Sequence, residues 1–323
     1  MILKPIHIFI SSIFTIFIGI LIYALILSLP LECEHLDYYI TIPKNSTVSS
    51  VSKILEDNLC LNSLIFKIAM KITMNEKNIR YGRYDFKSTN NVRSLIDMIT
   101  SIRSDRIKIT IPEGYKMSNI ATLFEEKIKI DVEEFISLCY NEDFISTLGI
   151  VNASSLEGYL FPDTYIFLKS YTEKDIIEIM VKQFLFNYNE YIDNSNTNLN
   201  RSEIVILASI IQGEAMYDDE MKTISSVYHN RLNKNMLLQA DPTIQYILPE
   251  TKKRILVKHT KIKNPYNTYL YKGLPPGPIN NPGVSAIIAA AYPIKTDYLY
   301  FVADNKGRHI FNKTFKAHLK SKN

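Results

Sequence analysis

A repeated pattern in the N-terminal half decides the fold class. Residues 39–58 have the sequence YITIPKNSTVSSVSKILEDN, and residues 108–127 have the sequence KITIPEGYKMSNIATLFEEK. The two segments align without a gap, with Ile42-Pro43 matching Ile111-Pro112. Proline cannot donate to a strand ladder, and the apolar residues that follow it have the spacing of an amphipathic helix. We therefore expect two strand–turn–helix units in an α+β fold, with chance similarity between short patterns as the alternative.

The segment before the repeat is apolar. Residues 6–29 carry no charge and as a helix would span about 36 Å, enough for a hydrocarbon core of about 30 Å. A cleaved signal peptide is the alternative, but its apolar region is shorter and ends at a small-residue cleavage site, which this segment lacks. We expect a cytoplasmic tail at 1–5 and a single-pass transmembrane helix at 6–29. Lys4 before the helix and acidic residues after it place the rest of the chain outside the cytoplasm.

Composition excludes several classes of protein. The 37 basic and 33 acidic residues leave a net charge of only +4, so the basic footprint of a nucleic-acid-binding protein is absent. Cys33, Cys60 and Cys139 form no CxxC pair, and no histidine lies near them at metal-ligand spacing. We expect no metal site and no cofactor. The odd number of cysteines argues against a disulfide framework but leaves a single bridge open.

The C-terminal half combines helices, a long irregular stretch and a hairpin. Residues 201–232 predict two helices with a short break between them. Residues 264–283 are rich in Pro, Gly and Asn and cannot form a helix. Residues 284–293 predict a short apolar helix, and the alternating residues 298–304 predict a strand that pairs with residues 307–312.

Glu214 is the leading catalytic candidate. It follows the apolar run IVILASIIQG at 204–213, in which Gly213 permits the close approach of another segment. A carboxyl group at the end of a buried helix is poorly solvated, which raises its pKa and lets it act as a general acid on a glycosidic oxygen. A solvated glutamate at a helix end is the ordinary alternative.

A glycosidase of the usual kind needs a second carboxyl group about 5–9.5 Å from the first. Asp218 and Asp241 are the candidates, but Asp218 belongs to an acidic cluster typical of a solvated helix cap, and Asp241 precedes Pro242 as in a turn. The irregular stretch offers rings and amides suited to N-acetyl sugars, with turn formation and packing as the alternatives. These residues are Tyr266, Asn267, Tyr269, Asn280 and Asn281.

Five segments resemble the endolytic murein transglycosylase family, also called MltG or YceG-like. They are LEGYLFPDTY (156–165), LASIIQGEA (207–215), VYHNRLNKNMLLQADPTIQY (227–246), NPYNTYLYKGLPPGPINNPG (264–283) and YLYFVADNKGRHIF (298–311). Their order and spacing match the family, and the resemblance covers essentially the whole chain. It implies a LysM-like α+β module at 38–104, after the anchor, and an α+β catalytic domain at 105–323.

The resemblance also implies a mechanism. The family's catalytic glutamate falls on Glu214, which would protonate the glycosidic oxygen between MurNAc and GlcNAc and then take a proton from the 6-hydroxyl of MurNAc. Cleavage within the strand would give 1,6-anhydro-MurNAc ends without consuming water and would limit the length of nascent strands. Matching family positions are expected to line the glycan groove, at Glu157, Asn230, Gln239, Asp241, Tyr266 and Asn267.

One departure keeps alternatives open. The family commonly has Glu-Lys-Glu where this chain has Gln212-Gly213-Glu214, so the first glutamate is lost and the catalytic one is kept. A catalytically inactive peptidoglycan-binding scaffold and a hydrolytic muramidase are the alternative functions. The resemblance further implies glycan strands as substrate, peptidoglycan synthases as partners, and a place in the bacterial inner membrane with the catalytic domain on its periplasmic side.

Overall fold

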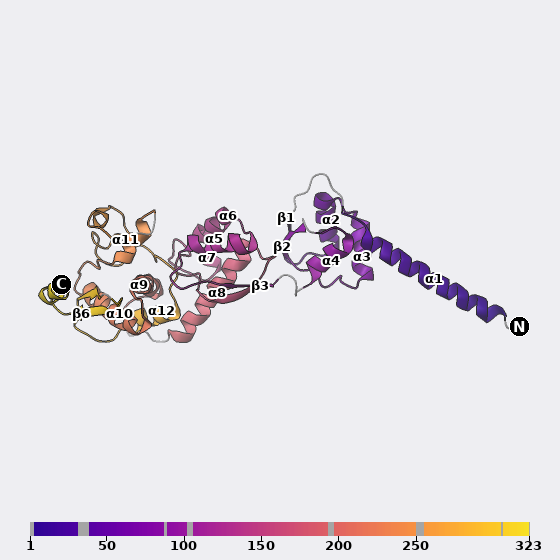
Figure 1. The fold of residues 1–323 in the computed structure, drawn as a ribbon. Helices are drawn as coiled ribbons and strands as arrows, with labels where there is room; N and C mark the ends of the chain where they lie inside the picture. The colour runs from indigo at the N-terminus through magenta and orange to yellow at the C-terminus, as the bar shows by residue number, and fades with distance from the viewer. Residues whose placement is uncertain are drawn as a thin grey trace. The chain divides into compact units, whose positions relative to one another are not determined.

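The structure is a computed structural model that combines α-helices with small sheets (Figure 1). The residues it describes are 3–31, 39–86, 89–101, 106–192, 197–249, 255–304 and 306–322. Each sheet formed by these residues has two strands. This mixture agrees with the predicted α+β class. The chain divides into two compact units, residues 1–108 with 166–172 and residues 109–165 with 173–323.

Helices surround one pair of strands in the first unit. The elements are α1 (Leu3–Ser28), β1 (Tyr39–Ile42), α2 (Val48–Leu59), α3 (Ser63–Ile72), β2 (Gly82–Asp85) and α4 (Val92–Thr100). β1 and β2 pair antiparallel in a register that sets Ile40 opposite Tyr84. Both side chains belong to a core to which the helices contribute Val51, Phe66 and Leu95. The apolar face of each amphipathic helix is therefore buried against the strand pair and its neighbours.

Both copies of the sequence repeat fold as predicted. β1 and β3 (Arg106–Thr110) are each followed by a turn with a positive φ, 62° at Asn45 and 76° at Gly114. The helices that follow, α2 and α5 (Met117–Ile128), have 12 residues each and end at aligned residues in the left-handed conformation. β3 pairs with β4 (Thr164–Leu168). The shared proline and apolar spacing, with a residue that tolerates a positive φ in each turn, therefore specified the same local structure twice.

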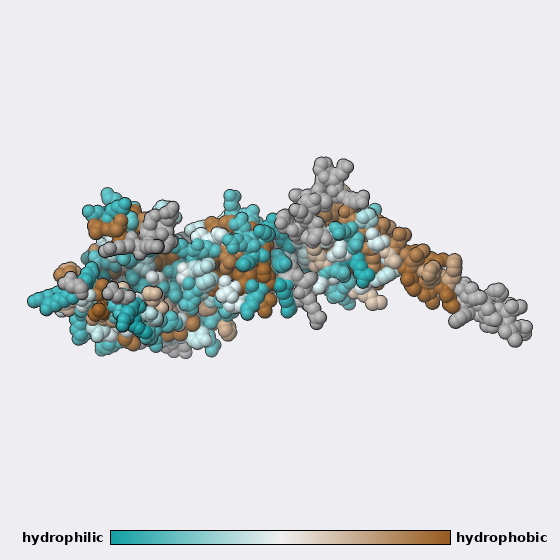
Figure 2. All heavy atoms as spheres, viewed as in Figure 1, coloured by the Kyte–Doolittle hydropathy of each residue, from teal (hydrophilic) through white to brown (hydrophobic). Residues whose placement is uncertain are grey.

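The predicted membrane anchor is corrected by the structure. Over the part of the chain that the structure describes, no helix combines the length and the apolar content that crossing a membrane requires. The described side chains of α1, at residues 13–28, are mostly apolar (Figure 2). Leu27 near the end of α1 is buried in the core of the first unit. The single-pass helix at 6–29 and the inner-membrane location are therefore not retained.

A helical core builds the second unit. Besides α5 its helices are α6 (Val132–Tyr140), α7 (Glu142–Thr147), α8 (Glu173–Tyr191), α9 (Arg201–Glu214), α10 (Asp218–Asn233), α11 (Asp241–Ile247), α12 (Val284–Ala291) and α13 (Phe315–Ser321), with a 3-10 turn at His259–Lys261. α9 packs against α10, α11 and α12. The predicted break between α9 and α10 is confirmed. α11 differs from the turn expected at Asp241-Pro242, because proline fits the first turn of a helix, where its missing N–H would have no partner.

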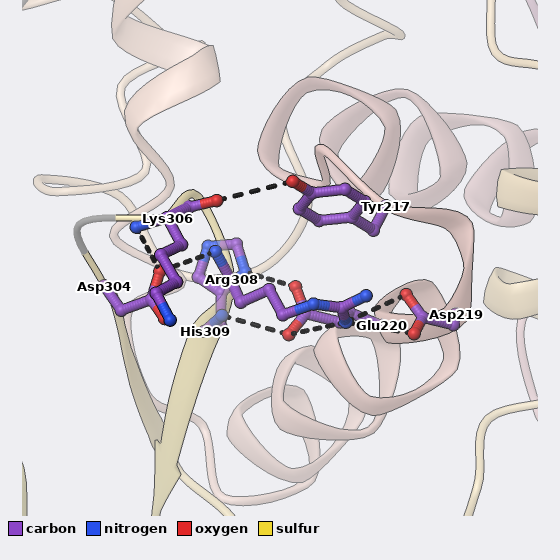
Figure 3. Close-up of polar contacts among 7 residues, drawn as sticks. All are labelled: Tyr217, Asp219, Glu220, Asp304, Lys306, Arg308 and His309. Atoms are coloured by element: carbon purple, nitrogen blue, oxygen red, sulfur yellow. Dashed lines mark hydrogen bonds and ion pairs between the residues drawn. The ribbon is translucent and has the colours of Figure 1, made fainter.

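The C-terminal hairpin is attached to the start of α10 (Figure 3). β5 (Tyr300–Ala303) and β6 (His309–Asn312) pair antiparallel as predicted. Arg308 forms an ion pair with Asp219 at 3.0 Å, and Glu220 accepts a hydrogen bond from the first backbone N–H of β6 at 3.0 Å. The acidic cluster at the start of α10 is thus more than a solvated helix cap, because it also fixes the hairpin to the helix.

Candidate active site

Helix α9 carries Glu214 to the edge of a cleft. A capping box closes its N-terminus, in which Asn200 and Glu203 each accept a hydrogen bond from the backbone N–H of the other. Every residue from Ile204 to Ile211 is buried, so protein surrounds the helix until its last turn. Glu214 is the final residue of α9 and is partly exposed. The predicted position of this carboxyl group, at the end of a buried helix, is confirmed.

Burial and two hydrogen-bond donors determine the protonation of Glu214. The pKa of its carboxyl group is raised to about 7, chiefly by desolvation and further by the negative charge of Asp241. The Tyr228 hydroxyl donates to Oε1 at 2.9 Å, and the backbone N–H of Asp241 also donates to the carboxyl group. Both donors favour the charged form and so lower the pKa. A group with this pKa exchanges its proton near neutral pH, as a general acid that later acts as a base requires.

Close packing between α9 and α11 brings a second carboxyl group to the same place. A Cβ atom at Gly213 would lie 2.7 Å from Cβ of Pro242, so only glycine allows the two helices to approach this closely. Asp241, which precedes that proline, accepts a hydrogen bond from the Tyr269 hydroxyl at 2.5 Å. The side chains of Glu214 and Asp241 consequently line one cleft.

The cleft has a volume of about 410 Å³, within the range of small-ligand sites. The irregular stretch forms one of its walls and is held on α9, because Asn280 Nδ2 donates to the Ser209 carbonyl at 2.8 Å. The turn before α5 and the start of α11 supply the other described walls. The described residues that line the cleft are Gly114, Lys116, Gly213, Glu214, Asp241, Pro242, Gln245, Ile255, Ile279 and Asn280.

The family model of the YceG-like family matches residues 40–323. The chain belongs to the YceG-like family. The endolytic murein transglycosylase of Bacillus subtilis (strain 168) is 35% identical over 304 residues, which cover 88% of this chain and 83% of that protein. The endolytic murein transglycosylase of Streptococcus pneumoniae serotype 2 (strain D39) is 29% identical over 309 residues, which cover 85% of this chain and 56% of that protein.

A solved structure gives the same result. The crystal structure of a YceG-like protein from Listeria monocytogenes is similar to this chain, with a TM-score of 0.62 and 34% identity. The match covers 88% of this chain and 98% of the Listeria chain. The family resemblance predicted from the five sequence segments is therefore confirmed.

Three of the groove residues predicted from the family resemblance, Gln239, Asp241 and Tyr266, lie at the cleft or close to residues that line it. Asp241 lines the cleft, and Gln239 is exposed two residues before it, with a φ of 50°. Tyr266 packs its ring against that of Tyr246, with ring centres 4.9 Å apart. The cleft-lining Lys116 has its Nζ 5.1 Å from the ring centre of Tyr246, so this ring pair lies next to a described wall of the cleft. These side chains are available to a ligand, and their role in binding stays a prediction.

Glu157 is placed in the protein interior. Its side chain is 4% exposed, and its Oε1 accepts hydrogen bonds from the backbone N–H of Met117 at 2.9 Å and from Asn281 Nδ2 at 3.0 Å. Desolvation is the main cause that raises its pKa to about 7. The carboxyl group thereby holds the start of α5 to the irregular stretch, behind the cleft wall to which Lys116 and Asn280 belong.

Two predicted amides are likewise used inside the protein. Asn230 Nδ2 donates to the backbone carbonyls of Thr296 and Tyr298, both at 2.9 Å. Asn267 is fully buried and donates to the carbonyl of Ile262 at 2.7 Å. Neither residue is among the described residues that line the cleft. In this YceG-like chain both side chains instead hold backbone segments of the second unit in place.

Two residues near Glu214 were not singled out by sequence patterns. Tyr228 is its hydrogen-bond donor, and the positive charge of Arg231 lowers its pKa. Arg231 is 7% exposed and donates to the backbone carbonyls of Leu299 at 2.7 Å and Leu238 at 2.6 Å. The sequence did contain one signal for these two residues: they are three residues apart on a predicted helix, which puts both side chains on one face.

Proposed function

We propose that this chain is an endolytic murein transglycosylase in which Glu214 acts first as a general acid and then as a general base. The observation that carries the proposal is the Glu214 carboxyl group at the cleft, with a pKa raised to about 7 and two hydrogen-bond donors. The relatives' names give the enzyme class, a lytic transglycosylase that acts on peptidoglycan as a carbon–oxygen lyase. The bond cleaved and the product formed are the finer part of the proposal.

The first step breaks the glycosidic bond. Protonated Glu214 donates its proton to the oxygen that joins C1 of MurNAc to GlcNAc, and the electron pair of the C1–O bond stays with that oxygen. Positive charge develops on the MurNAc ring. The new carboxylate is stabilised by the Tyr228 hydroxyl and the Asp241 N–H, since hydrogen bonds to an ionised acceptor are the strong ones. The positive charge of Arg231 favours the same carboxylate.

The second step closes a ring. The Glu214 carboxylate removes the proton from the 6-hydroxyl of MurNAc, and O6 forms a bond to C1. This returns Glu214 to its protonated form and leaves a 1,6-anhydro end. Because no water is added, the two product strands together have the mass of the substrate. A second carboxyl group is not required for either step.

One observation favours a second candidate function, a hydrolytic muramidase. The Asp241 carboxyl group lines the same cleft and its charge acts on Glu214, as the base or nucleophile of a hydrolase would. Digestion of purified glycan strands followed by mass spectrometry tests both functions. Ends that lack one water relative to a reducing end support the transglycosylase, whereas reducing ends that carry the water require the hydrolase instead. If the protein is correctly folded and still leaves the strands intact, the result would favour the inactive scaffold.

We propose a glycan-holding role for the first unit. Its strand–turn–helix segment and the family resemblance support a LysM-like module at 38–104 that holds a glycan strand while the catalytic domain at 105–323 cuts it. Cutting within strands would limit the length of newly made strands, and this places the enzyme beside peptidoglycan synthases. Binding of purified strands to the full chain, with and without substitutions on the exposed surface of α2, tests the glycan-holding part of the proposal.

A further inference from the structure

We propose that Lys116 binds a carboxylate carried by the glycan strand, so that the cleft selects acidic over neutral glycan beside Glu214. This inference rests on the proposed function, because it names the chemical group that the same cleft recognises. Lys116 was not among the residues that the sequence pattern or the family resemblance singled out.

The structure holds the Lys116 ammonium group in the cleft. Lys116 is the N-cap residue of α5 and lines the same cleft as Glu214. Its Nζ donates to the backbone carbonyl of Gln245 at 3.3 Å and lies 5.1 Å from the ring centre of Tyr246. The side chain therefore bridges the start of α5 and the middle of α11, and its charge is fixed in place before any ligand arrives.

The ammonium group keeps donors for a ligand. It has three N–H donors, and the hydrogen bond to Gln245 uses one of them. No ion pair joins Lys116 to a carboxylate among the described residues. Burial lowers its pKa, which means that the charged group is partly desolvated, while the negative charge of Glu157 favours the charged form. An anion that enters the cleft would restore the stabilisation that water no longer provides.

The charges of the cleft direct an acidic group to Lys116. Among the described lining residues, Lys116 is the positively charged side chain, whereas Glu214 and Asp241 carry the acidic groups. With Glu214 protonated for catalysis, a substrate carboxylate would be repelled by the charge of Asp241 and attracted by the ammonium group. The adjoining ring pair of Tyr246 and Tyr266 offers an apolar surface to a sugar ring. A sugar that carries a carboxylate fits both features.

Two parts of a glycan strand supply such a carboxylate. The lactyl group on O3 of MurNAc ends in a free carboxylate where the peptide has been removed, and a stem peptide brings its own carboxylates where it is attached. Both would form charge-assisted hydrogen bonds with an ammonium group. Four substrates distinguish the two sources. Two are strands without peptides, either with free lactyl carboxylates or with these carboxylates converted to methyl amides. The other two are peptide-bearing strands, with the peptide carboxylates either free or amidated.

The test measures kcat/KM of the full chain on these four substrates. The variants are Lys116→Met, which removes the charge, Lys116→Arg, which keeps it, and Lys127→Met, which removes an exposed charge from the same helix. We expect the wild type to prefer one acidic substrate over its amidated partner by about tenfold, the scale of a hydrogen bond to an ionised group. Lys116→Met should lose this preference through slower cleavage of the acidic strand alone. Lys116→Arg and Lys127→Met should keep it.

Two outcomes would overturn the inference. The first is that wild type and Lys116→Met have the same ratio of kcat/KM on the acidic strand to kcat/KM on its amidated partner. The second is that Lys116→Met lowers kcat/KM equally on all four substrates, which indicates a structural role. Binding of the same strands to Glu214→Gln, with and without Lys116→Met, is measured by calorimetry as an independent readout. Absence of cleavage by the wild type would refute the proposed function, whereas absence of any charge preference in binding would refute the role of Lys116.

Discussion

The hydroxyl group of Tyr228 lies 2.9 Å from Oε1 of Glu214 and donates its hydrogen to it. The two residues come from consecutive helices, α9 and α10, and Tyr228 is only 1% exposed. A buried neutral donor of this kind holds the carboxyl group in one orientation. It also stabilises the carboxylate once the proton has left, so the pair links the position of Glu214 to its protonation.

Replacement of the proposed acid should stop cutting. Glu214→Gln keeps the shape of the side chain but cannot donate a proton, and general acid catalysis is typically worth about 10²–10⁴-fold. We expect a loss of at least this size in the rate at which anhydro ends appear, with an unchanged circular dichroism spectrum. Asp218→Asn is the matched control, since Asp218 accepts a hydrogen bond from Ser285 and is not among the described lining residues. Full activity in Glu214→Gln would remove the catalytic assignment.

Removal of the Tyr228 hydroxyl should shift the pH profile. The hydroxyl favours the Glu214 carboxylate, so Tyr228→Phe raises the pKa of Glu214 above about 7. The alkaline limb of kcat/KM should therefore move to higher pH, because the acid stays protonated longer. The maximal rate should fall about tenfold, as the carboxylate loses one donor. Tyr217→Phe, at an exposed tyrosine before α10, is the control. An alkaline limb at the wild-type position would contradict the prediction.

The buried carboxyl group of Glu157 should make stability depend on pH. Its pKa is raised from 4.5 to about 7, so the folded state binds more protons than the unfolded state between these values. The free energy of unfolding therefore falls as pH rises from about 4.5 to 7. Glu157→Gln, whose oxygen can still accept both hydrogen bonds, should raise the free energy of unfolding at about pH 8 by on the order of 1–3 kcal/mol and change it little at about pH 4. Urea unfolding at the two pH values measures this, and equal effects at both would sink the idea.

The neighbours of residue 212 should make the folded protein more stable with glutamine than with glutamate at this position. Its Oε1 accepts the backbone N–H of Gly283 at 2.9 Å, and its side chain hydrogen-bonds the Glu113 carboxyl group. The pKa of Glu113 is raised by desolvation and by the charge of Asp218, and is lowered by Gln212. Gln212→Glu would place two carboxyl groups in contact, so we expect a loss of on the order of 1–2 kcal/mol at neutral pH that is recovered near pH 4.

The control for this substitution is Gln212→Met, which removes the hydrogen bonds without adding charge. Because Gln212 lowers the pKa of Glu113, the loss of its hydrogen bond should also reduce stability more at neutral than at acidic pH, but by less than Gln212→Glu does, since no second carboxyl group is added. Cutting by Gln212→Glu should fall by less than about tenfold, because Glu214 and its two donors are unchanged. A stability loss in Gln212→Glu that does not depend on pH would show that repulsion between carboxyl groups is not the cause.

Much of the local structure followed from sequence patterns. The proline and apolar spacing at 39–58 and 108–127 predicted two similar strand–turn–helix segments, and the structure adds that their turns have positive φ angles at Asn45 and Gly114. The break between α9 and α10 and the β5–β6 hairpin were predicted in the same way. The short helix at Asp241 was not, since a proline after an aspartate occurs both in turns and in the first turn of a helix.

The sequence by itself determined the family, the repeat and the position of Glu214 at the end of a buried helix, because these depend on residues that are close together in the chain. Only the tertiary structure decided which groups set the protonation of Glu214 and which polar side chains face inward. Tyr228 reaches Glu214 from α10, whereas Asp241 reaches it through the packing of α11 on α9 that Gly213 permits. Glu157 accepts a hydrogen bond from Asn281, which is 124 residues away. Burial and hydrogen-bond partners belong to contacts between distant segments, so no local pattern encodes them.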